Sequence, residues 1–200
     1  MKRYTDKDLD ELAEILKNDG VISVPTDTVY GVCARMDSEK AQENLRNVKH
    51  RPLTKAFPVM CSDLAQIESI AVCDARAVKM VHAFMPGPVT FILKKKEEIP
   101  DYVNGGMETL AIRMATSEAL KELIGKTGSP LFMTSANQSG QPTCQNLDEI
   151  EQSCPDLDGM LEGDVHFGEA STIIDLSKDE VKILRQGPVT MDQIEKVLNA

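Results

Sequence analysis

Hydrophobic residues recur along this chain at two spacings, one typical of helices and one typical of strands. Leu9, Leu12 and Leu16 recur at helical spacing, and Thr5 followed by Asp8 marks the start of that helix. Short apolar runs bounded by Gly, Pro or polar residues predict strands. Helices are expected near residues 5–17, 38–48, 63–69, 74–84, 116–124, 147–152 and 190–198, and strands near residues 21–24, 57–61, 89–93, 109–114, 131–134, 171–176 and 181–184.

The order of these segments indicates one α/β domain across residues 1–200. Strands and helices are mixed along the chain, which favours a sheet with helices packed on it. Some strands are separated only by hairpin-length loops, so a sheet of mixed polarity is expected. Thr116 is predicted to cap a helix that ends at Gly125, and residues 145–168 are acidic and irregular apart from one short helix.

Composition and net charge narrow the classes of function. The 200 residues are 42% hydrophobic and 27% charged, which is typical of a globular chain, and no apolar run is long enough to span a membrane. The net charge of −10 argues against broad, non-specific binding of nucleic acid. Any contact with RNA would therefore require a local basic patch.

The cysteines and histidines do not form a recognisable metal or disulfide pattern. The five cysteines are odd in number and include no Cys-x-x-Cys pair, and the three histidines lie at unrelated spacings. We therefore expect buried, reduced thiols. No secretory signal is visible at the N-terminus, so a cytoplasmic location is predicted.

One stretch reverses the acidic character of the chain. Between Arg46 and Met60 there are four cations, which include Lys49, Arg51 and Lys55, and no Asp or Glu. Guanidinium and ammonium groups bind phosphate oxygens, so this stretch is a candidate polyanion site. The plainer interpretation, a solvated basic helix end, stays open at this point.

Polar residues also cluster where predicted strands begin or end. Arg113 lies within an apolar strand, where a guanidinium needs an anionic partner. Residues 127–147 carry no charge and contain small polar groups that could wrap a phosphate or nucleoside. The alternatives are ordinary turns, a pairing of Arg113 with one of the 32 acids, and a surface position for Arg185.

Six motifs, in order along nearly the whole chain, resemble those of the YrdC-like family. They are Pro25–Gly31 with Lys49-x-Arg51-Pro52-x-x-Lys55, Pro86-Gly87-Pro88-x-Thr90, Arg113, Thr134–Pro142, Ser171–Asp175 and Arg185-x-Gly187. The resemblance implies a twisted α/β sheet of mixed polarity with flanking helices and a concave, positively charged cavity. It also implies a nucleotidyltransferase that forms threonylcarbamoyl-AMP and pyrophosphate from L-threonine, bicarbonate and ATP.

The resemblance assigns roles residue by residue. Thr28, Arg113 and Ser171 would hold L-threonine, with its carboxylate on the guanidinium. Met60 stands where relatives often have a histidine; because Met cannot donate a hydrogen bond, only packing against threonine is expected there. ATP would be bound by Arg51, Lys55, Thr109, Ser135, Asn137, Thr143 and Arg185, and the catalytic residues would be Lys49, Arg51 and Lys55.

The resemblance further implies a metal and partner proteins. Mg²⁺ is expected to be held mainly by the phosphates of ATP, with Asp27 and Asp175 as weak protein candidates and no dedicated metal site. Partner proteins of the TsaD, TsaB and TsaE type would transfer the threonylcarbamoyl group to tRNA as the t6A modification. A direct contact with tRNA or double-stranded RNA stays open, and no membrane contact is expected.

Two rival functions are considered. Similar domains act on carbamoyl phosphate in hydrogenase-maturation proteins, but within much longer chains that also carry acylphosphatase and zinc-finger modules. The other rival is an RNA-binding or ribosome-maturation module that uses the basic cavity without catalysis. Such a module would tolerate loss of Thr28 and Arg113 but would lose RNA when the basic patch is reversed in charge.

Overall fold

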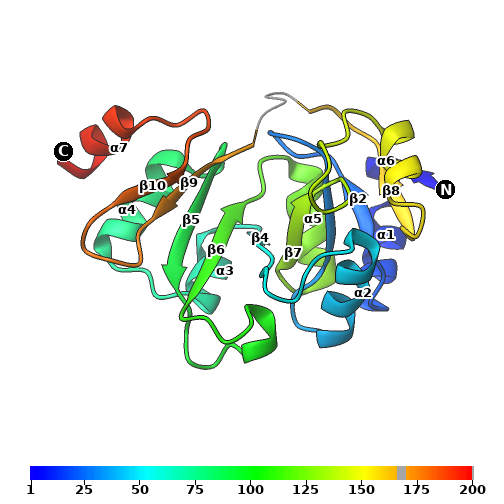
Figure 1. The fold of residues 1–200 in the computed structure, drawn as a ribbon, viewed down its shortest axis with the longest axis horizontal. Helices are drawn as coiled ribbons and strands as arrows, with labels where there is room; N and C mark the ends of the chain where they lie inside the picture. Colours follow the sequence, from blue (N-terminus) through cyan, green and yellow to red (C-terminus); the bar gives the residue numbers. More distant parts are fainter. Residues whose placement is uncertain (166–169, 200) are drawn as a thin grey trace.

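The computed structural model describes residues 1–165 and 170–199, which form one α/β domain on a ten-stranded sheet (Figure 1). The strand order is β1-β8-β2-β3-β7-β4-β6-β5-β9-β10. The neighbours β1·β8, β2·β8, β4·β6 and β5·β9 run parallel and the rest antiparallel, which confirms the predicted mixed polarity. The strands are β1 (Arg3–Tyr4), β2 (Ile22–Val24), β3 (Gly31–Arg35), β4 (Val59–Cys61), β5 (Val89–Lys94), β6 (Thr109–Met114), β7 (Leu131–Ser135), β8 (Gly159–Leu161), β9 (Thr172–Asp175) and β10 (Lys182–Arg185).

The helices lie where they were predicted, but both ends of α5 differ from the prediction. Ser117, not Thr116, caps α5 through the Leu120 N–H, and the helix continues past Gly125 to a left-handed Gly128 (φ 78°). No helix in the described residues is both long and apolar enough to cross a membrane. The helices are α1 (Leu9–Lys17), α2 (Glu39–Lys49), α3 (Leu64–Ile70), α4 (Ala75–Phe84), α5 (Glu118–Thr127), α6 (Leu147–Ser153) and α7 (Met191–Asn199), with 3₁₀ turns at Asp6–Asp8 and Asp101–Val103.

Three strands, β1, β3 and β8, were not predicted, and all three are ordered by pairing with other strands of the sheet. β3 follows the turn after β2 and pairs with both β2 and β7. β8 lies in the stretch expected to be irregular, where it pairs in parallel with β2 and with β1. Strands of two or three residues show no measurable periodicity, and Cys33 and Ala34 in β3 have no strong strand preference.

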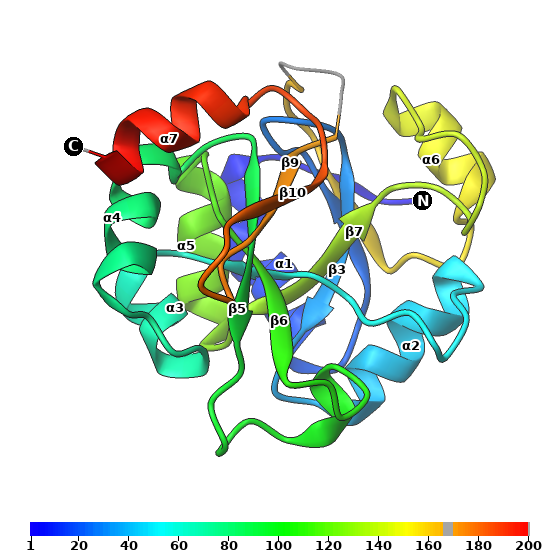
Figure 2. The same cartoon turned by 60° about the vertical axis from the view of Figure 1, so that its left-hand side comes forward.

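Strand residues alternate between a buried core and an open face of the sheet. Leu110, Ile112 and Met114 of β6 lie in the core cluster that also contains residues of α3, α4 and α7. Ala111 and Arg113 are the alternate residues of the same strand, so they point to the opposite face. Figure 2 shows α3, α4 and α7 together on one side of the twisted sheet. A second core cluster joins α1 and α5 to β2 and β7.

Candidate active site

A cavity of about 280 Å³ lies on the face of β5, β6 and β9 that points away from the core of α3 and α4. Ala111 and Arg113 reach the cavity from β6, and Thr90 and Ile173 reach it from β5 and β9. Its other sides are closed by the turn after β2 and by the end of β7. Ligand cavities in proteins start at roughly 300 Å³, so this volume suits a small metabolite.

Arg113 is the charged centre of this cavity. Its Nη2 donates to Asp27 Oδ1 at 2.7 Å, and its Nη1 donates to Thr28 Oγ1 at 3.0 Å. The side chains of Arg113 and Asp27 are only 13% and 8% exposed. Burial lowers the pKa of Arg113, and the Asp27 carboxylate opposes that shift, so the guanidinium remains charged.

The two threonines of the turn after β2 extend this hydrogen-bond chain. The Thr26 hydroxyl donates to Val29 O at 2.6 Å, so the Thr28 hydroxyl, 3.1 Å from Thr26 Oγ1, is the donor of that second bond. Thr26 Oγ1 also accepts the Thr28 N–H at 3.2 Å, a side-chain bond typical of a tight turn. The turn therefore presents Thr28 to Arg113 in one orientation.

Ser171 is fixed on the opposite wall of the cavity. Its hydroxyl lies 2.7 Å from Thr90 Oγ1, and Arg185 Nη2 donates to Ser171 O at 2.8 Å and to Ser171 Oγ at 3.2 Å. Gly187 packs against the backbone on either side of Ser171, where an added Cβ would lie 2.5 Å from Ala170 O and from Thr172 N. A side chain at position 187 would therefore displace the Ser171 backbone.

Lys49 is buried against the end of β7 and the residues that follow it. It is 1% exposed, and its ammonium donates to Ser135 O, to Asn137 O and, at 3.3 Å, to Asn137 Oδ1. Burial lowers the pKa of Lys49 to about 8. Ser135 Oγ donates to the same Asn137 oxygen at 2.6 Å. Lys49 thus fixes the positions of Ser135 and Asn137 through hydrogen bonds to both residues.

The rest of the basic stretch is organised around Phe57. The guanidinium carbons of Arg46 and Arg51 lie 5.0 Å and 4.8 Å from the centre of the Phe57 ring. Arg51 Nη2 donates to Ala56 O at 2.6 Å, and Arg46 Nη1 donates to Pro52 O at 2.7 Å. Burial lowers the pKa of both arginines.

The structure brings half of the predicted site residues to this one cavity. The others lie outside its lining: Lys55 is exposed, and Met60 is 1% exposed in the core cluster of α1 and α5, so it offers no packing surface to a ligand there. Thr109 lies at the other end of β6, paired with Lys94. The predicted residues that line the cavity are Thr28, Arg113, Ser135, Thr143, Ser171 and Arg185, and those outside it are Lys49, Arg51, Lys55, Met60, Thr109 and Asn137.

Sequence reasoning gave no role in substrate binding to Thr26, Thr90 or Asp27. Thr26 and Thr90 line the cavity, and Asp27 pairs with its arginine. Thr26 and Asp27 belong to the first motif and Thr90 to the Pro-Gly-Pro motif, so the signal was present in the sequence. Which side chain faces the cavity depends on strand register, which the motifs do not give.

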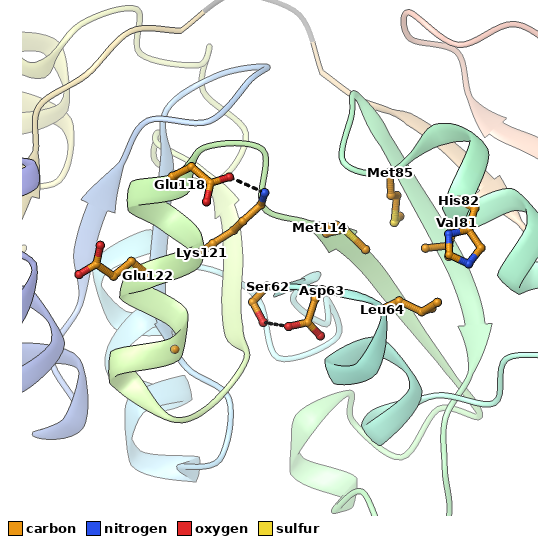
Figure 3. A pocket seen from close by; sticks show the side chains of 11 residues that line it. Ser62, Asp63, Leu64, Val81, His82, Met85, Met114, Glu118, Lys121 and Glu122 are labelled. Atoms are coloured by element: carbon orange, nitrogen blue, oxygen red, sulfur yellow. Dashed lines mark hydrogen bonds and ion pairs between the residues drawn. The ribbon is translucent and has the colours of Figure 1, made fainter.

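A larger hollow of about 650 Å³ lies between α5 and the pair α3 and α4 (Figure 3). Its polar groups largely bond to each other: Lys121 pairs with Glu118 at 2.7 Å, and Ser62 Oγ donates to Asp63 at 2.9 Å. It contains none of the predicted site residues. Volume alone therefore does not identify the functional site.

The described residues contain no group of three or more His, Cys, Asp or Glu side chains that could hold a metal ion. The two carboxylates considered for Mg²⁺ have protein partners instead. Asp27 pairs with Arg113 through Oδ1, while its Oδ2 is buried without a protein partner, and Asp175 Oδ1 accepts from the backbone and hydroxyl of Ser177. Neither one is part of a carboxylate cluster.

The sequence and the fold were compared with those of known proteins. The sequence profile of the Sua5/yciO/yrdC family, described as telomere recombination, matches residues 14–187. The putative threonylcarbamoyl-AMP synthase of Methanocaldococcus jannaschii is 32% identical over 192 residues, covering 95% of this chain and 90% of that protein. The threonylcarbamoyl-AMP synthase of Pyrococcus abyssi is 31% identical over 192 residues, covering 93% of this chain and 56% of that protein. The structure of P. abyssi Sua5 complexed with L-threonine matches with a TM-score of 0.90 at 28% identity, covering 98% of this chain and 60% of that one.

Fold and site together define an α/β domain with a small polar cavity on one face of a mixed sheet. The chain belongs to the Sua5/YciO/YrdC family, which confirms the resemblance drawn from its motifs. It spans little more than half of the length of the Pyrococcus relatives.

Proposed function

We propose that this chain is a threonylcarbamoyl-AMP synthase, a nucleotidyltransferase that joins L-threonine, bicarbonate and ATP with release of pyrophosphate. The observation that carries the proposal is the bond between Thr28 Oγ1 and Arg113 Nη1 at 3.0 Å inside a cavity of about 280 Å³. It places a guanidinium and a hydroxyl where one small amino acid can contact both. The names of the relatives and the threonine complex of P. abyssi Sua5 support the same activity.

In this proposal the amino acid lies across the cavity. Its carboxylate binds the guanidinium of Arg113, which has N–H groups left over after its bonds to Asp27 and Thr28. The hydroxyls of Thr28 and Ser171 meet its amine and side-chain hydroxyl. Ala111 and Ile173 provide apolar surface for its methyl group.

ATP would bind beside the amino acid, between the cavity and the basic stretch. Ser135, Thr143 and Arg185 line the cavity, and Arg51 and Lys55 lie in the loop after α2. Lys49 and Asn137 do not contact the cavity, so we assign them the task of holding Ser135. The cations would neutralise the triphosphate and align its α-phosphorus.

The reaction needs alignment more than a strong base. The amine of threonine condenses with bicarbonate to give a carbamate and water. A carbamate oxygen then bonds to the α-phosphorus, and the bond from that phosphorus to the bridging oxygen breaks, which releases pyrophosphate. The attacking group is already anionic, so charge neutralisation and exclusion of water are the tasks left to the protein.

We further propose that Mg²⁺ binds through the phosphates of ATP, where it would offset their negative charge. The residues near the cavity fit this arrangement, because they offer hydroxyls and cations to phosphate and the Asp27 carboxylate already pairs with Arg113 through Oδ1. In the cytoplasm, the product would pass to a protein that transfers the threonylcarbamoyl group to tRNA.

The test is incubation of the protein with ATP, bicarbonate, Mg²⁺ and each amino acid in turn, with pyrophosphate as the readout and mass spectrometry of the product. We expect pyrophosphate release that requires both threonine and bicarbonate. Release that is independent of the amino acid would contradict the proposal and favour the carbamoyl phosphate chemistry of the hydrogenase-maturation domains.

A further inference from the structure

We infer that Asp27 is a positioning residue of the amino-acid site: it fixes the guanidinium of Arg113 from outside the cavity, so that a substrate carboxylate meets a preset orientation. The inference rests on the proposed binding of threonine at Arg113. It assigns to Asp27 a role in substrate affinity rather than in metal binding.

Asp27 belongs to the turn that follows β2, and its side chain and that of Arg113 line two different hollows. Arg113 lines the cavity of about 280 Å³, whereas Asp27 lines a separate hollow of about 360 Å³. Thr26 is common to both linings. Asp27 therefore reaches the amino-acid site only through the guanidinium, which is the arrangement expected of a residue that acts through another.

The contacts of the guanidinium show what Asp27 controls. Nη2 is held by Asp27 at 2.7 Å and Nη1 by Thr28 at 3.0 Å, while Nε is buried and has no protein partner. Two different nitrogens are thus fixed by two adjacent residues of one turn. A planar group held at two points cannot rotate, so its remaining N–H groups keep one direction.

Neutralising a buried charge is the simpler role for Asp27, and it makes different predictions. Asp27 Oδ1 is the only carboxylate oxygen within ion-pairing distance of Arg113 in the described residues. Removing one partner of a buried pair destabilises a protein through the unpaired charge that remains. A role confined to charge neutralisation would be preserved in Asp27→Glu, which keeps the charge and adds one methylene. A positioning role would not be preserved, because the longer side chain moves the guanidinium.

The test is a double-mutant cycle with Asp27→Asn, Arg113→Gln and the combined variant, together with Asp27→Glu. Calorimetry with L-threonine and, separately, with ATP gives the affinities, and thermal unfolding shows that each variant is folded. The cycle gives the coupling between the two side chains. If Asp27→Asn alone is unstable, Asp27→Glu keeps the charge and still distinguishes positioning from charge neutralisation. Asp37→Asn is the matched control, since Asp37 pairs with Arg35 at 2.6 Å outside the cavity.

We expect Asp27→Asn and Asp27→Glu each to weaken threonine binding about tenfold, which is about 1.4 kcal/mol, and to leave ATP binding unchanged. Asp27→Asn should have no further effect on threonine when Arg113 is already Gln. Threonine affinity within twofold of the wild type in Asp27→Glu, or an equal loss in the Arg113→Gln background, would overturn the inference. If the wild type binds threonine but releases no pyrophosphate, the proposed function fails while this inference stands; if the wild type does not bind threonine, both fail.

Discussion

Thr90 of β5 and Ser171, the residue before the parallel strand β9, hold their hydroxyl oxygens 2.7 Å apart, although 81 residues separate them in the sequence. Both residues line the cavity that also contains Arg113, so a threonine bound to Arg113 would meet the Ser171 hydroxyl in the orientation that Thr90 gives it. Thr90, which sequence reasoning did not assign, therefore belongs to the same candidate site as Ser171.

Ser171→Ala should raise the KM for threonine about three- to tenfold, because one neutral hydrogen bond to the substrate is lost. Thr90→Val should have a smaller effect in the same direction, since it frees the Ser171 hydroxyl without removing it. Ser177→Ala is the control, because that hydroxyl bonds to Asp175 instead. Unchanged threonine kinetics in Ser171→Ala would remove this wall from the substrate site.

Arg113→Ala should raise the KM for threonine about 30- to 100-fold, since a charge-assisted contact to the carboxylate is worth about 2–3 kcal/mol. The KM for ATP should change little. Arg113→Lys should recover only part of the loss, because an ammonium cannot reproduce the planar arrangement. Steady-state kinetics at saturating ATP and bicarbonate make the measurement, and a threonine KM equal to that of the wild type would exclude Arg113 from the site.

Gly187→Ala should destabilise the protein by about 1–3 kcal/mol and also weaken threonine binding. The added Cβ would lie 2.5 Å from Ala170 O and from Thr172 N, so the backbone that carries Ser171 must move. Gly125→Ala is a matched control, because nothing lies within 4 Å of a Cβ at that helical position. We expect that control to be neutral or slightly stabilising. Urea unfolding and threonine calorimetry together check the prediction, and a Gly187→Ala protein as stable as the control would contradict it.

Local chemistry made much of the fold predictable. Ser38, Asp63 and Asp74 each accept a backbone N–H in the first turn of the helix that they precede, so the helix starts were readable. The hairpin of β9 and β10 was predicted from two adjacent runs of strand-like residues. Strands β3 and β8 were missed, because three to five residues with weak preferences are ordered only by their neighbours in the sheet.

The candidate site was predictable only in part, because local sequence signals identify residues but not their partners. Arg113 stood out as a charge in an apolar strand, but its partner could not be read from the sequence, because Asp27 is 86 residues away. Lys49 was expected beside the substrate, and its ammonium donates to the backbone oxygen of Ser135. Met60 was expected near threonine, and the register of β4 turns it into the core of α1 and α5. Strand register and burial decide these details, and the motifs specify neither.

Lys55→Ala should weaken ATP binding about three- to tenfold without changing threonine binding. Lys55 is exposed, so the loss of one phosphate contact is reduced by solvent screening. The effect should also shrink as salt is added. Lys79→Ala is the control, because Lys79 is an exposed cation on α4, away from the cavity. Nucleotide titration by calorimetry makes the measurement, and equal ATP affinity in both variants would place Lys55 outside the nucleotide site.

The contribution of Lys49 to the stability of the fold should increase between pH 8 and pH 10.5. Its pKa is lowered to about 8 in the folded protein, from an ordinary value of 10.5, chiefly by burial. Between these two values the unfolded chain binds more protons than the folded one, so the free energy of unfolding rises with pH. A difference of this size is worth roughly 3 kcal/mol at most.

Lys49→Met isolates this contribution, because the variant keeps the other titrating groups. The variant should be less stable than the wild type at every pH, since Ser135 O and Asn137 O lose their donor. The stability of the wild type relative to the variant should then increase as the pH is raised from 7.5 to 10.5 in urea unfolding experiments. A difference that stays constant over this range would show that the ammonium of Lys49 titrates as it does in water.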